Sequence, residues 1–421
     1  MASQLAGLPV DIMFELCAHL CTHCQEAYIS RPAPHIHPAE RKEIRLRRSA
    51  LAALSRASKS LREIATPYLY HFIYHQREDR GTTLPSLIRT VTSRPDLARH
   101  IKHIEVDHTN FCTLSEEIAE QLSHAATERN LPLLPKWSTH LYRRPLVLLE
   151  LLLLHSPNAN TIHLLMTHGT TFSDLAVLSE TAGGFNLPAL TTLSASRHPT
   201  ASSHPTDESQ EGLYFRFRHS FPLFYAAVAA PKQGLRTLSL RRACDIISNF
   251  VPTPQGLNPL ATVTSLTLDS CRITLEQAAD LITACDSLEI FHMLFFHTIT
   301  SHPEADVKDS RVVLDAIRKH TATLRVLSLD NSRDPLVRSV EDVETLKGFA
   351  KLESLFVGLT MLGGEDRFVS LWDDEETGRR AMQGDGFLAG MLPASFSSAR
   401  GHLDSEGRVS ALAAADEFAD I

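Results

Sequence analysis

The sequence lacks the short signatures that mark most catalytic centres. It has no phosphate-binding loop, no Gly-x-Gly-x-x-Gly, no Gly-x-Ser-x-Gly and no His-Glu-x-x-His. His292 lies in an expected strand, but no residue next to it in the sequence would orient it as a general base. We therefore expect a protein that is not an enzyme and has no cofactor.

A long apolar run and a secretory leader are missing too. The run Leu146 to Leu154 is nine residues long and contains Glu150, whereas a helix needs about 20 apolar residues to cross a bilayer. The N-terminus has no basic, apolar and small-residue leader pattern, and the chain has seven cysteines. We expect free thiols, a cytoplasmic or nuclear location and no membrane partner.

The sequence does contain enough apolar material for a sizeable core. Hydrophobic residues make up 43% of the chain and charged residues 21%, as in ordinary globular domains. Its 421 residues exceed the roughly 250 to 300 at which a single core stops growing. Two folding units or an elongated array are therefore expected.

Apolar residues near the N-terminus recur at helical spacing. A first stripe consists of Ile12, Leu16 and Leu20, and Pro9 suits the first turn of the helix that carries it. A second stripe consists of Leu51, Leu54, Leu61 and Ile64. Pro67 should end the helical segment that carries this second stripe.

Several further features accompany these stripes at the N-terminus. They are Leu8-Pro9, the aliphatic residues that follow, the Ser/Lys-rich turn Ser58-Lys59-Ser60-Leu61-Arg62 and the ending Ala65-Thr66-Pro67-Tyr68-Leu69-Tyr70-His71. Together they resemble the F-box family, and its fungal members in particular. Two features depart from the family pattern: Leu61 stands where many F-boxes carry a tryptophan, and residues 21–49 form a long insertion.

The resemblance implies that residues 1–75 form a helical element that binds the Skp-type adaptor of a cullin-RING ubiquitin ligase, and through it the cullin. Leu16 could equally serve the core of the helical element itself. The implied adaptor-binding residues are Leu8, Pro9, Ile12, Leu16, Leu54, Leu61 and Leu69.

The charge pattern fits this implied partner, because the adaptor is acidic in that family. Residues 31–64 hold nine Lys or Arg and three Asp or Glu, a local charge of +6, so the rest of a chain of charge −8 sums to −14. Two other interpretations stay open, a solvated amphipathic helix and nucleic acid. Nucleic acid is the less favoured of these, because Ile44 and Leu46 alternate with the charges.

Residues 76–362 repeat the frame apolar-x-x-apolar-x-apolar. Its last two apolar residues are two apart, so both point to one face of a strand, which only stacked neighbouring strands can bury. The intervals between copies, 58, 31, 45, 28, 25, 36 and 28 residues, include several near the 20 to 29 of a leucine-rich repeat. The eight copies begin at Ile101, Ala159, Leu190, Leu235, Val263, Leu288, Leu324 and Leu352.

Helical segments between the copies supply the return path that a parallel sheet requires. The clearest begins after Thr274, a good N-cap, and others are Pro145 to His155 and Arg311 to His320. We expect an α/β fold in which the helical F-box is followed by an irregular leucine-rich-repeat solenoid with a parallel sheet. A doubly wound sheet is the alternative.

A leucine-rich repeat usually places Asn or Cys three residues after the last apolar position, where its side chain hydrogen-bonds the turning backbone. In this sequence the corresponding turn positions are Thr109, Thr167, Cys271, Ser332 and Thr360.

Strand residues that point away from the core would form a concave surface for an unknown target protein, with Leu294 and Phe356 as apolar anchors. The expected target-binding residues are Ser239, Arg241, Thr267, Asp269, His292, Leu294, Ser328, Asp330 and Phe356.

Two further regions stand apart. Residues 363–421 begin with a glycine-rich and acidic stretch and are expected to be partly disordered or to cap the array. Cys17, His19, Cys21, His23 and Cys24 lie close together in the sequence, with His35 and His37 nearby, and thiols and imidazoles are zinc ligands. Cys21 and Cys24 have the spacing of a zinc ligand pair that His35 or His37 could complete. No second pair at that spacing follows, so we favour core or loop positions for these residues and no bound metal.

The resemblance to F-box proteins with leucine-rich repeats thus implies a substrate-recognition subunit of an SCF-type ubiquitin ligase. The F-box would hold the adaptor and the concave face of the repeats would hold the target. The alternative is an interaction scaffold whose F-box-like element no longer engages a ligase. Leu61 and the insertion at 21–49 are the features that favour it.

Overall fold

The computed structural model divides the chain into two compact units, Met1–Leu235 and Arg236–Ile421. Both are built from helices and strands. The described residues are 8–25, 38–75, 83–107, 120, 146–166, 187, 189–197, 215–216, 234–244, 258, 260–294, 297–298, 310–330, 348–357, 400–403 and 409–412.

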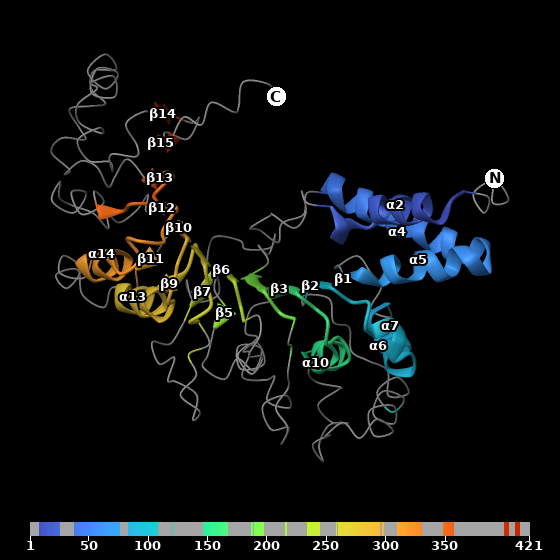
Figure 1. Ribbon diagram of the computed structural model, residues 1–421. Coiled ribbons are helices and arrows are strands. Elements are labelled where there is room, and N and C mark those ends of the chain that lie inside the picture. Colours follow the sequence, from blue (N-terminus) through green and yellow to red (C-terminus); the bar gives the residue numbers. More distant parts are fainter. Residues whose placement is uncertain are drawn as a thin grey trace. The chain divides into compact units, whose positions relative to one another are not determined.

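The first unit begins with three helices that lie against one another (Figure 1). They are α2 (Val10–Leu20), α4 (Pro38–Ala57) and α5 (Lys59–His71), and the short 3-10 helix η1 (Thr22–Cys24) follows α2. All three contribute to one apolar core, because each turns one face toward the other two. Its buried members are Met13, Cys17, Cys21, Leu51, Leu54, Leu61, Ile64 and Ala65.

The inward face of α2 differs from the predicted stripe. Ile12 is 51% exposed, whereas Met13 and Cys17 are 2% and 0% exposed. Leu16 and Leu20 pack against the core from its edge. Residues four apart drift by about 40° around a helix at each step. The inward face of α2, formed by Met13, Leu16, Cys17 and Leu20, therefore combines spacings of three and four residues.

The second stripe is buried as predicted, but two helices carry it. α4 ends at Ala57, and the Ser58 hydroxyl caps α5 by accepting a hydrogen bond from the Leu61 N–H at 3.1 Å. The Ser/Lys-rich turn thus separates Leu51 and Leu54 from the residues of α5.

The prediction that Pro67 ends the helix is wrong. Helix α5 continues through Pro67 to His71. Proline has no N–H, so the helix loses one backbone hydrogen bond there. Tyr68 and Leu69, directly after the proline, pack against the helical core, and their burial offsets that loss.

A four-stranded parallel sheet completes the first unit. Its strands lie in the order β1 (Phe72–His75), β2 (His103–Asp107), β3 (Thr161–Met166) and β4 (Thr192–Arg197). Helices α6 (Thr83–Ser93), α7 (Pro95–Ala98) and α10 (Leu146–His155) connect or flank them, and β5 (Phe215–Arg216) follows. Strand β1 was not predicted, because its four residues directly continue a helical stripe.

The second unit contains the longer parallel run. Strands β6 (Thr237–Arg241), β8 (Ser265–Asp269), β10 (Ile290–Leu294), β12 (Val326–Asp330) and β13 (Ser354–Val357) pair in that order. Helices α13 (Leu275–Ala284) and α14 (Ser310–Arg318) lie side by side next to these strands (Figure 1). The short strands β7 (Ala243–Cys244), β9 (Arg272–Ile273) and β11 (His297–Thr298) pair in parallel beside them.

Within the segment predicted as a C-terminal cap or disordered tail, two strands are described. β15 (Val409–Leu412) pairs antiparallel with β13, and β14 (Arg400–Leu403) pairs antiparallel with β15. The acidic stretch itself lies outside the described residues. Among the helices that are described, none is long and apolar enough to span a membrane.

The eight predicted frames correspond to the strands β2, β3, β4, β6, β8, β10, β12 and β13. Every described apolar frame residue is at most 7% exposed. Asn160 and Thr161 both donate backbone hydrogen bonds to the Lys102 carbonyl. The same pairing recurs where Thr264 and Ser265 donate to the Arg236 carbonyl, at 2.9 and 3.0 Å. The chain therefore has the predicted α/β architecture with a parallel sheet.

The turns after the frames also follow the predicted chemistry where they are described. Cys271 is buried, and its thiol donates a hydrogen bond to the Leu240 carbonyl at 3.3 Å. Thr274 caps α13 through a reciprocal pair of hydrogen bonds with Gln277. The other four predicted turn positions lie outside the described residues.

Candidate functional site

Exposed apolar side chains gather where α2 begins. Leu8, Val10, Ile12 and Phe14 are 39%, 56%, 51% and 44% exposed. Elsewhere in the described residues, Leu46 and Val312 are the large apolar side chains with comparable exposure. Val10 and Phe14 lie on one side of α2 and Ile12 on the opposite side, because residues two apart on a helix are separated by about 200°. Exposed apolar surface at one end of a helix typically marks a region that another molecule covers.

The predicted adaptor-binding residues fall into two groups. Leu8, Pro9 and Ile12 are exposed, and Leu16 and Leu69 lie at the edge of the helical core. Leu54 and Leu61 are 9% and 2% exposed inside that core. They therefore support the surface from behind rather than form it. The sequence analysis missed Val10 and Phe14, although their spacing of four residues places them on one side of α2.

Helix α4 joins the helical element to the first strands. Ile44 is buried against Phe72 and Tyr74 on β1, and Arg48 donates to the Tyr74 carbonyl at 3.5 Å. The opposite side of α4 carries exposed Arg45 and Leu46. Helix α4 thus packs Ile44 on β1, while Leu51 and Leu54 face the core of the helical element.

A groove of about 470 Å³ opens beside this helix. Arg45 and Arg48 line it together with Leu69 and Tyr70 of α5. The two guanidinium groups give the groove a positive charge, which suits an acidic partner better than a basic one.

Strand register aligns the predicted target-binding residues in two rows across the second unit. Ser239, Thr267, His292, Ser328 and Phe356 are successive neighbours in the first row. The second row consists of Arg241, Asp269, Leu294 and Asp330.

The accessibility of these rows is uneven. Ser239, Thr267 and Ser328 are buried, whereas His292 and Leu294 remain half-buried. Burial lowers the pKa of His292, so its ring is neutral at pH 7. The side chains of Asp330 and Phe356 lie outside the described residues.

An ion pair occupies the start of the second row. The Arg241 Nε lies 2.8 Å from Asp269 Oδ2, and the two side chains are 29% and 16% exposed. Because each charge is already matched by the other, the pair adds polarity and shape to the face but little net charge. Among the described side chains of these two rows, Leu294 is the apolar one, and it remains half-buried.

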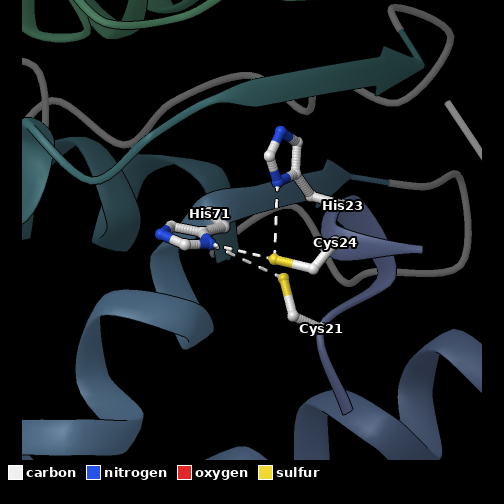
Figure 2. Close-up of side chains that lie close together, drawn as sticks. All are labelled: Cys21, His23, Cys24 and His71. Atoms are coloured by element: carbon white, nitrogen blue, oxygen red, sulfur yellow. Dashed lines mark hydrogen bonds between the residues drawn. The ribbon is translucent and has the colours of Figure 1, made fainter. Parts of the chain in front are cut away.

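A cluster of two cysteines and two histidines lies at the other end of α2 (Figure 2). Cys21, His23 and Cys24 come from the turn after α2, and His71 is the last residue of α5. Their ligand atoms all lie within 4.8 Å of one another. Figure 2 shows that both thiols and both imidazoles point toward a common centre.

The distances within the cluster are short and similar. Cys24 Sγ lies 3.6 Å from His71 Nδ1 and 3.8 Å from His23 Nδ1, and Cys21 Sγ lies 3.8 Å from His71 Nδ1. The pKa of Cys24 is lowered to about 3, first by a hydrogen bond from Cys21 and then by the two imidazoles. The pKa of Cys21 is raised, because its hydrogen bond to Cys24 and its burial favour the thiol.

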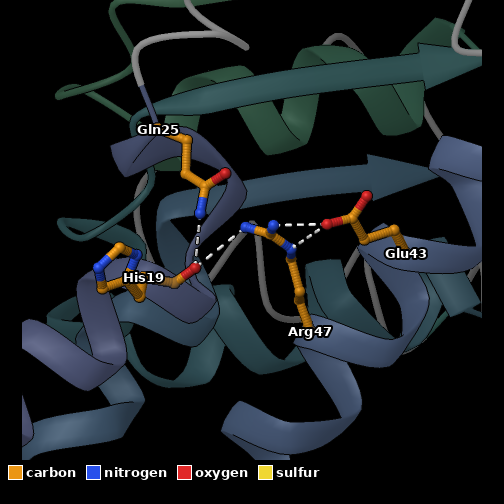
Figure 3. Close-up of polar contacts among 4 residues, drawn as sticks. All are labelled: His19, Gln25, Glu43 and Arg47. Carbon is orange, nitrogen blue, oxygen red and sulfur yellow. Dashed lines mark hydrogen bonds and ion pairs between the residues drawn. The ribbon is translucent and has the colours of Figure 1, made fainter.

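A polar clamp holds the turn that carries three of these residues (Figure 3). The His19 carbonyl at the end of α2 accepts hydrogen bonds from Gln25 Nε2 at 2.7 Å and from Arg47 Nη1 at 3.0 Å. Glu43 fixes the same guanidinium through Nε at 3.0 Å. Arg47 on helix α4 therefore anchors the start of the turn, and Gln25 ties the end of the turn to the same His19 carbonyl.

Three members of this cluster, Cys21, His23 and Cys24, were already grouped in the sequence, but the fourth was not. Cys21 and Cys24 were considered as a pair, whereas His71 was seen only as part of the F-box-like ending. His35 and His37 lie outside the described residues. The sequence gives no local signal for His71, because 47 residues separate it from Cys24.

In comparisons with known proteins, the chain matches neither any family model nor any curated protein.

Proposed function

We propose that this protein is the substrate-recognition subunit of an SCF-type cullin-RING ubiquitin ligase. Its helical element would bind a Skp-type adaptor, and the outer face of its repeat strands would bind the target. The protein itself performs no covalent chemistry. It holds the target close to the ubiquitin-charged enzyme at the far end of the ligase, which raises the effective concentration of the target.

The observation that carries this proposal is the exposed apolar start of α2. Leu8, Val10, Ile12 and Phe14 are at least 39% exposed although each is large and apolar. The residues behind them, Met13 and Cys17, are buried in the helical core. A rigid helix end that presents unsatisfied apolar surface is suited to a protein partner.

Leu294 carries the target-binding part of the proposal. It is half-buried and lies between Asp269 and Asp330 in the strand register. An apolar side chain flanked by polar neighbours provides an anchor inside a polar rim, the arrangement that concentrates binding energy in protein interfaces.

The adaptor contact can be tested by co-purification with the double variant Leu8→Glu/Ile12→Glu. Both side chains are exposed, so the variant should fold, and two buried charges should reduce the recovered adaptor and cullin at least about tenfold. Val312→Glu is the matched control, because Val312 is 38% exposed against 39% for Leu8 and lies in the other unit. Full adaptor recovery with a double variant that melts like the wild type would refute the proposed surface.

Target capture should respond to a different substitution. Leu294→Glu should release partners that the wild type retains, while adaptor recovery stays unchanged. The double variant Leu8→Glu/Ile12→Glu should show the opposite behaviour, keeping the target and losing the adaptor. Partners that bind both variants with wild-type affinity would argue against Leu294 as an anchor.

An interaction scaffold outside any ligase is the alternative function. The observation that favours it is the burial of Leu54 and Leu61, which removes two of the expected contact residues from the surface. A scaffold would capture the same target through Leu294 without adaptor or cullin. Absence of adaptor from the wild-type co-purification would therefore favour the scaffold.

A further inference from the structure

The turn after α2 and the end of α5 bring together a set of side chains that the proposed function does not use. We propose that Cys21, His23, Cys24 and His71 bind one zinc ion, which ties the turn after α2 to the junction between α5 and β1. Two thiolates and two imidazoles are a ligand set that zinc favours in structural sites. This proposal does not depend on adaptor binding.

The distances fit a tetrahedral ion. Zinc–sulfur bonds of about 2.3 Å and zinc–nitrogen bonds of about 2.05 Å separate sulfur and nitrogen ligands by roughly 3.6 Å in a tetrahedron. The sulfur–nitrogen distances that involve His71 and His23 are 3.6, 3.8 and 3.8 Å. An ion can therefore enter the centre with shifts of a few tenths of an ångström in these distances, on the order of the usual spread of such bonds.

The local backbone already holds the two cysteines in position. The Cys24 N–H donates to the Cys21 carbonyl at 3.1 Å, which closes the turn between them. Arg47 and Gln25 fix the flanking backbone through the His19 carbonyl (Figure 3). Preorganised ligands lose little conformational entropy when the ion binds.

His71 is held independently of the turn. It is the last residue of α5, and its carbonyl accepts a hydrogen bond from the Lys102 N–H at 3.0 Å. The Tyr68 ring lies 5.0 Å from its imidazole, measured between ring centroids. The fourth ligand is therefore positioned by the helix and by the start of the repeat sheet.

The charges and coordination point to a structural role. Two thiolates cancel the charge of Zn²⁺, and the two imidazoles bind as neutral ligands. Binding requires Cys21 to release its thiol proton to solvent, because the thiolate is the ligand. Four protein ligands leave no position for a substrate or a water nucleophile. The ion would fix α2 relative to β1, which begins directly after His71.

The experiment measures zinc in the full-length chain, purified without a chelating step and supplied with zinc during expression. About one zinc per chain is expected in the wild type, as one four-ligand site requires. Cys24→Ser and His71→Asn should each retain at least about tenfold less. His19→Asn is the matched control and should retain the full amount, because its side chain is exposed and outside the cluster.

Cobalt substitution keeps the test decisive if a variant fails to fold. Cobalt(II) added to the metal-free wild type should give the intense visible bands of tetrahedral coordination and a thiolate charge-transfer band. A wild-type chain that binds neither ion overturns the proposal, and so does a Cys21–Cys24 disulfide in place of metal. Zinc retained in both ligand variants would also overturn it, because the ion would then lie elsewhere.

Discussion

Two histidines on the neighbouring strands β2 and β3 are buried in the first unit, although ionisable side chains mostly lie at protein surfaces. His103 and His163 are 3% and 9% exposed, and their rings stack with centroids 4.9 Å apart. Burial lowers the pKa of both, that of His163 to about 4. The stack is compatible with the fold only while both rings are neutral, because two imidazolium ions in contact would repel each other.

This stack predicts a loss of stability in mild acid. The unfolded chain protonates His163 near its ordinary pKa of 6.5, whereas the folded chain does so only near pH 4. Between these values the unfolded state binds more protons. Stability is therefore fully present above about pH 6.5, and falls by about 3 kcal/mol as the pH drops to 4.

Urea unfolding of the wild type and His163→Gln across this pH range checks the prediction. The variant cannot titrate at this position, so its free energy of unfolding should depend less steeply on pH. Equal slopes for the two proteins would show that His163 does not carry the effect.

The Cys/His cluster shows what a sequence reveals about a site at the residue scale. The two-residue spacing of Cys21 and Cys24 is visible in the sequence, because both lie on one turn. The approach of His71 depends on how α2 and α5 pack on one another. No periodicity in the sequence reports that packing, so the fourth ligand could be found only in three dimensions.

At the scale of single elements, Pro67 offers a direct test of why α5 continues. Pro67→Ala restores an N–H that can bond to the helical carbonyl four residues earlier, and it removes the clash of the ring. We expect the free energy of unfolding to rise by about 1 to 3 kcal/mol. Thermal and urea unfolding measure this change, with Thr66→Ala as a control in the same turn. A fall in stability would mean that the proline ring itself is needed for the packing of Tyr68 and Leu69.

The strands of the repeats were the most predictable elements. Each frame residue marks an inward position, and the described ones are buried. Leu266 on β8 is 0% exposed between β6 and β10. Leu266→Ala should therefore cost about 2 to 5 kcal/mol of stability.

The matched substitution for this prediction is Ser265→Ala, one residue earlier and half-buried on the other face of β8. It should change stability by less than about 1 kcal/mol. The comparison uses the midpoints of urea unfolding. Similar losses in both variants would contradict the assignment of one inward and one outward face.

Other elements were harder to predict for identifiable reasons. β1 is hidden in the sequence because Phe72, Ile73 and Tyr74 directly follow α5 and continue its apolar pattern. The inward face of α2 was misassigned because several stripes are possible when Ile12, Met13, Leu16 and Cys17 are all apolar. Packing against α4 and α5 selects one of these stripes.

At the scale of the whole molecule, charge is distributed unevenly. Residues 31–64 carry a net charge of +6, and the remainder of the chain carries −14. If the helical element binds an acidic adaptor as proposed, long-range attraction should speed the association. Raising the salt concentration should then slow association severalfold, with a smaller effect on dissociation.

Association kinetics with purified adaptor at low and high salt check this prediction. Arg45→Ala is an informative variant, because Arg45 is exposed and lines the groove beside α4. It should associate more slowly than the wild type at low salt and at nearly the same rate at high salt. A rate that does not depend on salt would exclude electrostatic steering.

At the start of several strands, two successive backbone N–H groups donate to a single carbonyl of the preceding strand unit, and this pattern limits how the chain could change in evolution. In the second unit, Arg236 receives the N–H groups of Thr264 and Ser265, and Thr264 in turn receives those of Glu289 and Ile290. If the chain between two such carbonyls were removed as one complete strand-to-strand unit, the next pair of N–H groups would meet an equivalent carbonyl acceptor. Removing part of a unit would leave buried donors unsatisfied. Ancestral duplications and losses should accordingly have involved complete strand-to-strand units rather than fragments of a unit.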